Sequence, residues 1–172
     1  GVTFTDSVCG NLTLEEDWTF DEHYVYVGAD NDLGTAVWEQ LAVSYSGAGF
    51  SEAGFYDSFD DYDATIWTTP SDRYAYVGGE LQVSGGAGEY LTSPHLRTVD
   101  PMSVTQIQAT LNKSDECSDH FIMLSREPEE DWRWSGFESG TVRIAWNCTF
   151  KYIFGQMESV YVDCPELGVN SL

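Results

Sequence analysis

Residues 141–148 alternate between apolar and polar side chains, and this pattern constrains the fold more than any other in the sequence. The apolar positions are Val142, Ile144, Trp146 and Cys148, and the intervening positions are Thr141, Arg143, Ala145 and Asn147. A side-chain period of two is typical of a β-strand with one buried and one exposed face. The pattern predicts a strand in which Trp146 belongs to the core and Asn147 faces outward.

Neighbouring segments extend the same prediction. Phe150, Tyr152 and Phe154 alternate with Lys151 and Ile153, which indicates a continuation or a second strand. Residues 121–124 are apolar without interruption. A strand with apolar side chains on both faces is usually central in its sheet and covered on both sides.

Other short runs complete an all-β interpretation. Residues 24–27 read as a strand, residues 37–41 as a strand or a helical turn, and Gly78-Gly79 as the turn between two strands. Ile107, Ala109 and Leu111 alternate before Asn112. Strands recur about every ten residues, and no segment forms a convincing amphipathic helix. We therefore predict a two-sheet antiparallel β-sandwich.

The glycine-rich residues 46–49 indicate a boundary between an N-terminal extension and the main domain. We expect residues 1–50 to form an N-terminal extension with short strands and residues 51–172 to form the sandwich domain. The 172 residues are enough to bury a sizeable core.

The charge of the chain limits its partners. It has 29 acidic and 7 basic residues, and a formal net charge of −22. A field of that sign argues against nucleic acid and anionic membrane surfaces, and it favours neutral ligands, cations, or a salty medium that screens the self-repulsion. No run of about 18 apolar residues is present, so we expect no membrane insertion.

Cysteines and glycosylation sequons together predict a secreted or cell-surface protein. The four cysteines lack C-x-x-C spacing, and their even number suits two disulfides. We predict the pairs Cys117 with Cys148 and Cys9 with Cys164, although four cysteines allow three connectivities. The N-x-[ST] sequons predict N-glycans at Asn11, Asn112 and Asn147.

The segments DSFDDYDATIW and YAYVGGELQVSGGAGEYLTSPHL carry a resemblance to a known superfamily. They resemble the opening of concanavalin A-like lectin and glucanase jelly rolls, which include laminarinase-like and LamG-like proteins. In those proteins an Asp-Phe-Asp start leads to a tryptophan and then to a G-G-x-L-x-V hairpin. The resemblance covers about residues 55–165 and implies a jelly-roll β-sandwich. It also implies that calcium is a candidate structural ion, with Asp57, Asp60, Asp61 and Asp63 as candidate oxygen ligands.

The catalytic motif of the laminarinase-type members is incomplete here. That motif is Glu-x-Asp-x-x-Glu or Glu-x-Asp-x-Glu, with the two glutamates as nucleophile and general acid. Glu129 and Asp131 match its first two positions, but Arg133 and Trp134 occupy those of the second glutamate. Retaining glycoside hydrolysis needs two closely placed carboxyl groups. We therefore expect a non-catalytic protein, with a glycoside hydrolase as the alternative.

Trp132 and Trp134 suggest a carbohydrate-binding shelf. They share one face if the segment is extended, with Arg133 on the other face, and Glu129 and Asp131 lie nearby. Tryptophan rings stack on sugar rings, and carboxylates accept hydrogen bonds from sugar hydroxyls. Core packing is the competing role for these tryptophans.

Two functions follow from these observations. The first is a lectin-like module that binds a polysaccharide or glycan. The second is a structural glycoprotein of an extracellular coat or filament, which self-assembles when residues 1–50 add a strand to a neighbouring sheet.

Overall fold

The computed structural model describes eleven segments of the chain, and every regular element in them is a β-strand. The segments are residues 2–5, 11–14, 22–30, 35–46, 54–68, 74–84, 95–112, 119–126, 142–146, 150–154 and 159–163. The prediction of an all-β fold is confirmed for these residues. They contain no helix that could cross a membrane.

Fourteen strands run through the described segments. They are β1 (Val2–Thr5), β2 (Asn11–Leu14), β3 (Tyr24–Asp30), β4 (Thr35–Ser46), β5 (Gly54–Asp57), β6 (Trp67–Thr68), β7 (Tyr74–Tyr76), β8 (Leu81–Ser84), β9 (His95–Thr98), β10 (Ser103–Asn112), β11 (Asp119–Ser125), β12 (Val142–Trp146), β13 (Phe150–Phe154) and β14 (Ser159–Asp163).

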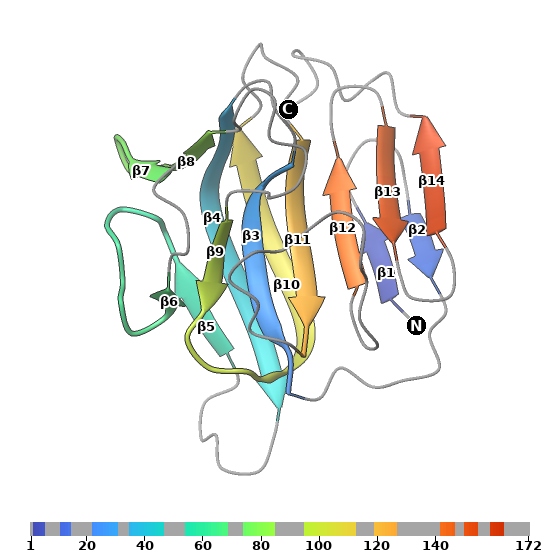
Figure 1. Cartoon of the computed structure of the whole chain (residues 1–172), viewed down its shortest axis with the longest axis horizontal. Coiled ribbons are helices and arrows are strands. Elements are labelled where there is room, and N and C mark those ends of the chain that lie inside the picture. The colour runs from blue at the N-terminus through green and yellow to red at the C-terminus, as the bar shows by residue number, and fades with distance from the viewer. Residues whose placement is uncertain are drawn as a thin grey trace.

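These strands form two large sheets in which every pairing is antiparallel (Figure 1). One sheet has the order β10-β4-β8-β7, with β5 also paired to β4. The other has the order β14-β13-β12-β11-β3-β9-β6. Strands β1 and β2 pair with each other, and β2 also contacts β13 and β14.

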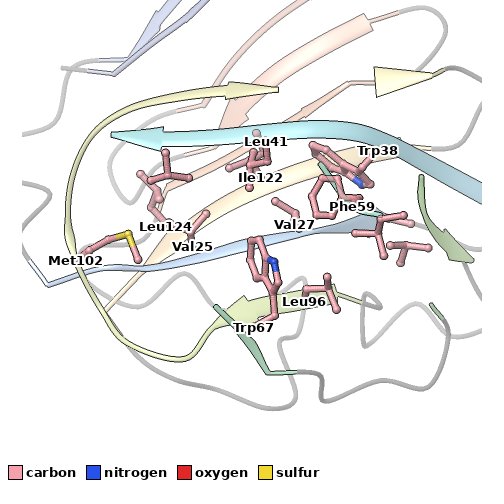
Figure 2. Packing of buried hydrophobic residues seen from close by; sticks show 14 residues of the cluster. Val25, Val27, Trp38, Leu41, Phe59, Trp67, Leu96, Met102, Ile122 and Leu124 are labelled. Carbon is pink, nitrogen blue, oxygen red and sulfur yellow. The ribbon is translucent and has the colours of Figure 1, made fainter. Parts of the chain in front are cut away.

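The hydrophobic core receives side chains from both sheets, as in a β-sandwich. Trp38 and Leu41 come from β4, while Val25 and Val27 come from β3, and all four are fully buried. Figure 2 shows this cluster, to which Trp67 and Leu96 also contribute. Burial of such side chains supplies the main free energy that favours folding.

Strand β11 lies in the interior of its sheet, between β12 and β3. Phe121 and Met123 are fully buried, and the alternate residues Ile122 and Leu124 are 7% and 6% exposed. Both faces of β11 are therefore covered, and the prediction of a central strand is confirmed. Strands β12 and β13 also form where the alternation predicts them, and Val142 is buried.

Residues 24–46, which we expected within an N-terminal extension, are built into the two sheets. Val27 in β3 lies opposite Ile122 in β11, and Val43 in β4 lies opposite Ile107 in β10. β4 also settles the ambiguity at residues 37–41, which form a strand. Their apolar side chains become core because each strand pairs with a strand far along the chain, β3 with β11 and β4 with β10.

Candidate functional site

The Asp57 carboxylate organises the turn that follows β5. Its Oδ1 accepts a hydrogen bond of 2.7 Å from the backbone N–H of Phe59, and its Oδ2 accepts one of 2.5 Å from Nε1 of Trp67. Phe59 has a φ of 56°, which a side chain other than glycine adopts at a cost. Its ring stacks on Trp67, with centroids 6.4 Å apart. Asp57 thus fixes two buried aromatic residues.

The other three aspartates of this segment make local hydrogen bonds. Asp60 accepts from the hydroxyl of Ser58, Asp61 from the backbone N–H of Tyr62, and Asp63 from both the hydroxyl and the N–H of Thr65. The bonds from Thr65 lower the pKa of Asp63. Within the described residues, no three acidic, histidine or cysteine side chains gather in a way that could hold a metal ion.

Three tyrosines meet at the β7 edge of the five-stranded sheet, and we name them the tyrosine cluster. The centroid of Tyr62 is 6.1 Å from that of Tyr74 and 6.3 Å from that of Tyr76, and the last two are 6.0 Å apart. The Tyr62 hydroxyl donates a hydrogen bond of 2.7 Å to the carbonyl oxygen of Trp67. Tyr74 and Tyr76 pack against the core, which holds them in place.

A tight hairpin turn lies beside this cluster. Gly78 and Gly79 have φ angles of 65° and 81°, and Val77 and Glu80 exchange two backbone hydrogen bonds across them. Two successive positive φ angles are the signature of a type I′ turn, which glycine adopts at no steric cost. A Cβ added to Gly79 would lie 3.1 Å from Oδ1 of Asp60. The predicted Gly-Gly turn is therefore confirmed, and its tip lies next to a carboxylate.

The exposed part of this region combines an aromatic ring with carboxylates. Tyr62 is 36% exposed, and Asp60 and Asp61 are exposed beside it in the chain. Because its hydroxyl bonds to Trp67, the Tyr62 ring is held in one orientation. An aromatic face with adjacent acceptors can stack on a sugar ring and bind its hydroxyls.

Two of the cluster's hydroxyls resist ionisation. Burial raises the pKa of Tyr76 well above its usual range, and the Asp57 charge raises it further. Burial and the neighbouring Tyr74 raise the pKa of Tyr62 as well. Because the folded state resists an ionisation that the unfolded state permits, these raised pKa values leave the free energy of unfolding unchanged below a pH of about 10 and lower it as pH rises above that value.

The Tyr62 hydroxyl has a hydrogen-bond partner among the described residues and the Tyr76 hydroxyl does not, so removing each should change the free energy of unfolding differently. We expect Tyr62→Phe to lower the free energy of unfolding by about 1 kcal/mol, because a bond to the Trp67 carbonyl is lost. Within the described part of the chain, the buried Tyr76 hydroxyl has no hydrogen-bond partner. Tyr76→Phe should therefore be neutral or stabilising at pH 7, and it should reduce the loss of stability above pH 10. Urea denaturation of both variants across pH tests this, and an equal loss for the two at pH 7 would contradict it.

Several predicted site residues lie outside the described residues. They are Glu129, Asp131, Trp132, Arg133, Trp134, Asn147, Cys9, Cys117, Cys148 and Cys164. Among the sequons, Asn11 begins β2 and Asn112 ends β10. The tyrosine cluster was not anticipated from sequence. The i, i+2 spacing of Tyr74 and Tyr76 could have placed them on one strand face, but no local pattern marks Tyr62 as their neighbour.

Comparison of the chain with protein-family models, curated proteins and solved structures gives no match in any of the three. Function is therefore inferred from the side chains themselves.

Proposed function

We propose that the protein is a secreted, N-glycosylated, non-catalytic β-sandwich that binds a neutral polysaccharide or glycan outside the cell. Two antiparallel sheets around one core support the sandwich, and we propose the concanavalin A-like jelly roll as its finer class. The four cysteines and three sequons support the extracellular location. A role as a building block of a coat or filament is compatible with the same fold.

The observation that carries this proposal is the tyrosine cluster with its flanking carboxylates. Tyr62 presents a partly exposed ring that Tyr74, Tyr76 and the bond to Trp67 hold in place. Little side-chain entropy is lost when a ligand stacks on a ring that is already fixed. Asp60 and Asp61 stand next to it as hydrogen-bond acceptors.

The net charge supports a neutral ligand. A chain with a net charge of −22 repels polyanions at low salt, but it exerts no such force on an uncharged glucan. The carboxylates that make the surface acidic are also acceptors for sugar hydroxyls. Stacking and hydrogen bonding, rather than ion pairing, then set the affinity.

We expect the intact protein to bind a neutral glucan such as laminarin, and Tyr62→Ala to weaken that binding by about tenfold through the lost stacking. Tyr56→Ala is the matched control, because Tyr56 is 58% exposed and takes part in no ring contact of the cluster. Isothermal titration calorimetry would measure both. Thermal unfolding of each variant separates lost binding from lost folding.

The double variant Trp132→Ala and Trp134→Ala distinguishes the two candidate binding sites. If this variant alone loses binding, the site is the tryptophan shelf predicted from sequence and not the tyrosine cluster. Absence of binding to any neutral glycan on an array would contradict the carbohydrate proposal altogether. Release of reducing sugar from laminarin, abolished by Glu129→Gln, would instead support the glycoside hydrolase.

A further inference from the structure

Among the strands that the structure describes, β10 lies at the edge of its sheet, and it carries no charge. Its ten residues, SVTQIQATLN, contain no Asp, Glu, Lys, Arg or Pro, and it ends the five-stranded sheet with β4 as its hydrogen-bonded neighbour. Natural proteins normally protect a long edge with charges, prolines or bulges, because its unpaired N–H and C=O groups can pair with another chain. Only register irregularities, near Val104 and Leu111, interrupt this one.

Between those irregularities, residues 106–110 form a regular run with two different faces. Gln106, Gln108 and Thr110 alternate on one face and are exposed. Ile107 and Ala109 alternate on the core face, where Ile107 packs against the core but Ala109 is exposed. The apolar face of this edge is thus incompletely covered.

The β4 positions that pair with the regular run of β10 are uncharged as well, and Glu39 lies in the irregularity just beyond them. The positions of β4 opposite the polar face of β10 are Gln40, Ala42 and Ser44. In a chain of net charge −22, the run of uncharged positions along residues 106–110 and their β4 partners is a place where two copies can approach with little local repulsion. This argument selects a second copy of the chain over a cationic partner, which the acidic surfaces elsewhere would attract instead.

We propose that β10 pairs antiparallel with β10 of a second copy across a two-fold axis at Gln108. This register places Gln108 opposite its own symmetry mate, Gln106 opposite Thr110 and Ile107 opposite Ala109 of the second copy. Ile107 then covers the exposed Ala109, and no like charges meet. The two five-stranded sheets become one continuous sheet. The inference goes beyond carbohydrate binding and does not rest on it.

The experiment measures the dimer dissociation constant of the full chain by sedimentation equilibrium at low and high sodium chloride. We expect a dimer that salt strengthens, because screening reduces repulsion between two acidic copies. Both Gln108→Glu and Gln108→Lys should raise the dissociation constant by at least about tenfold, since each places like charges face to face. Thr110→Glu and Thr110→Lys provide a second pair at the same edge.

The lysine variant separates a local interface from a general charge effect. Gln108→Lys lowers the net negative charge, so if overall charge alone controlled association, this variant would dimerise more tightly than the natural chain. Ala64→Glu and Ala64→Lys, in an exposed turn outside the sheet, are the matched controls and should change association little. Thermal unfolding verifies that every variant is folded.

Three results would overturn the proposal. They are a monomer at all protein and salt concentrations, a dimer unaffected by the variants at positions 108 and 110, and a tighter dimer for Gln108→Lys. A monomer whose laminarin binding is lost in the position 108 variants would assign this edge to a polysaccharide instead.

Discussion

Replacing Asp57 by alanine should lower the free energy of unfolding by about 4 kcal/mol, because two buried donors lose a charged acceptor. These donors are Nε1 of Trp67 and the backbone N–H of Phe59, and both residues are almost completely inaccessible to water. Urea denaturation followed by tryptophan fluorescence measures the loss.

Two further substitutions test whether the loss of stability in Asp57→Ala comes from its specific hydrogen bonds or from the removal of a charge. Asp57→Asn keeps one acceptor but turns an amide N–H₂ toward the other donor. We therefore expect it to lower the free energy of unfolding, but by less than Asp57→Ala does. Asp60→Ala removes an exposed carboxylate whose partner is the Ser58 hydroxyl, and it should cost little. Equal losses for Asp57→Ala and Asp60→Ala would contradict the role that we assign to Asp57.

The same variants address the calcium prediction. Melting temperature is compared in calcium chloride and in sodium chloride at matched ionic strength, so that screening contributes equally to both. A calcium ion bound to the native state would raise the melting temperature only in the first salt. If Asp57 were a ligand of that ion, the calcium effect would disappear in Asp57→Asn.

We expect Gly54→Ala to be the most damaging of the small substitutions, with a loss of about 3 kcal/mol from forced separation of two strands. A Cβ at this position would lie 2.1 Å from the carbonyl oxygen of Val43 and 3.0 Å from its carbonyl carbon. These are backbone atoms of β4, which cannot rotate out of the way. β5 must therefore move away from β4 and weaken the pairing of Gly54 with Ser44.

Gly78→Ala is the matched control, since it adds the same methyl group elsewhere. No atom of the residues that the structure describes lies within 4 Å of a Cβ at Gly78, but its φ of 65° is unfavourable for alanine. We expect a loss of about 1 kcal/mol from this conformational cost alone. Thermal unfolding would rank the two variants, and a greater loss for Gly78→Ala would contradict the steric argument.

Local sequence patterns predicted the strands and the turn whose burial or backbone conformation depends on neighbouring residues in the chain. The alternation at residues 141–147 predicts β12, because a side-chain period of two is typical of a strand with one buried face. The unbroken apolar run at 121–124 predicts β11, because it is typical of a strand that is covered on both faces. Gly78-Gly79 specifies its turn in the same way, since few other residues adopt two successive positive φ angles.

Such local patterns do not predict which distant strands pair with each other. Residues 24–46 looked like an appendage because a glycine-rich segment follows them, yet β3 and β4 lie inside the two sheets. β3 pairs with β11 and β9, and β4 pairs with β10 as well as with the nearer β5 and β8. Asp57 was interpreted as a candidate calcium ligand, because no local signal shows that the Trp67 indole points back at its carboxylate.

The placement of β3 and β4 has a consequence for how the chain folds during synthesis. Both strands leave the ribosome before β10 and β11, so Val27 must wait for Ile122, and Val43 for Ile107, before either strand can complete its sheet. Contacts between such distant residues close long loops, and domains dominated by them fold in milliseconds to seconds rather than microseconds. β4 can pair earlier with β5 and β8, but it lacks β10 until residue 112 has emerged, and β3 lacks β11 until residue 125 has emerged. Strands β3 and β4 are therefore apolar segments of the nascent chain to which a chaperone could bind.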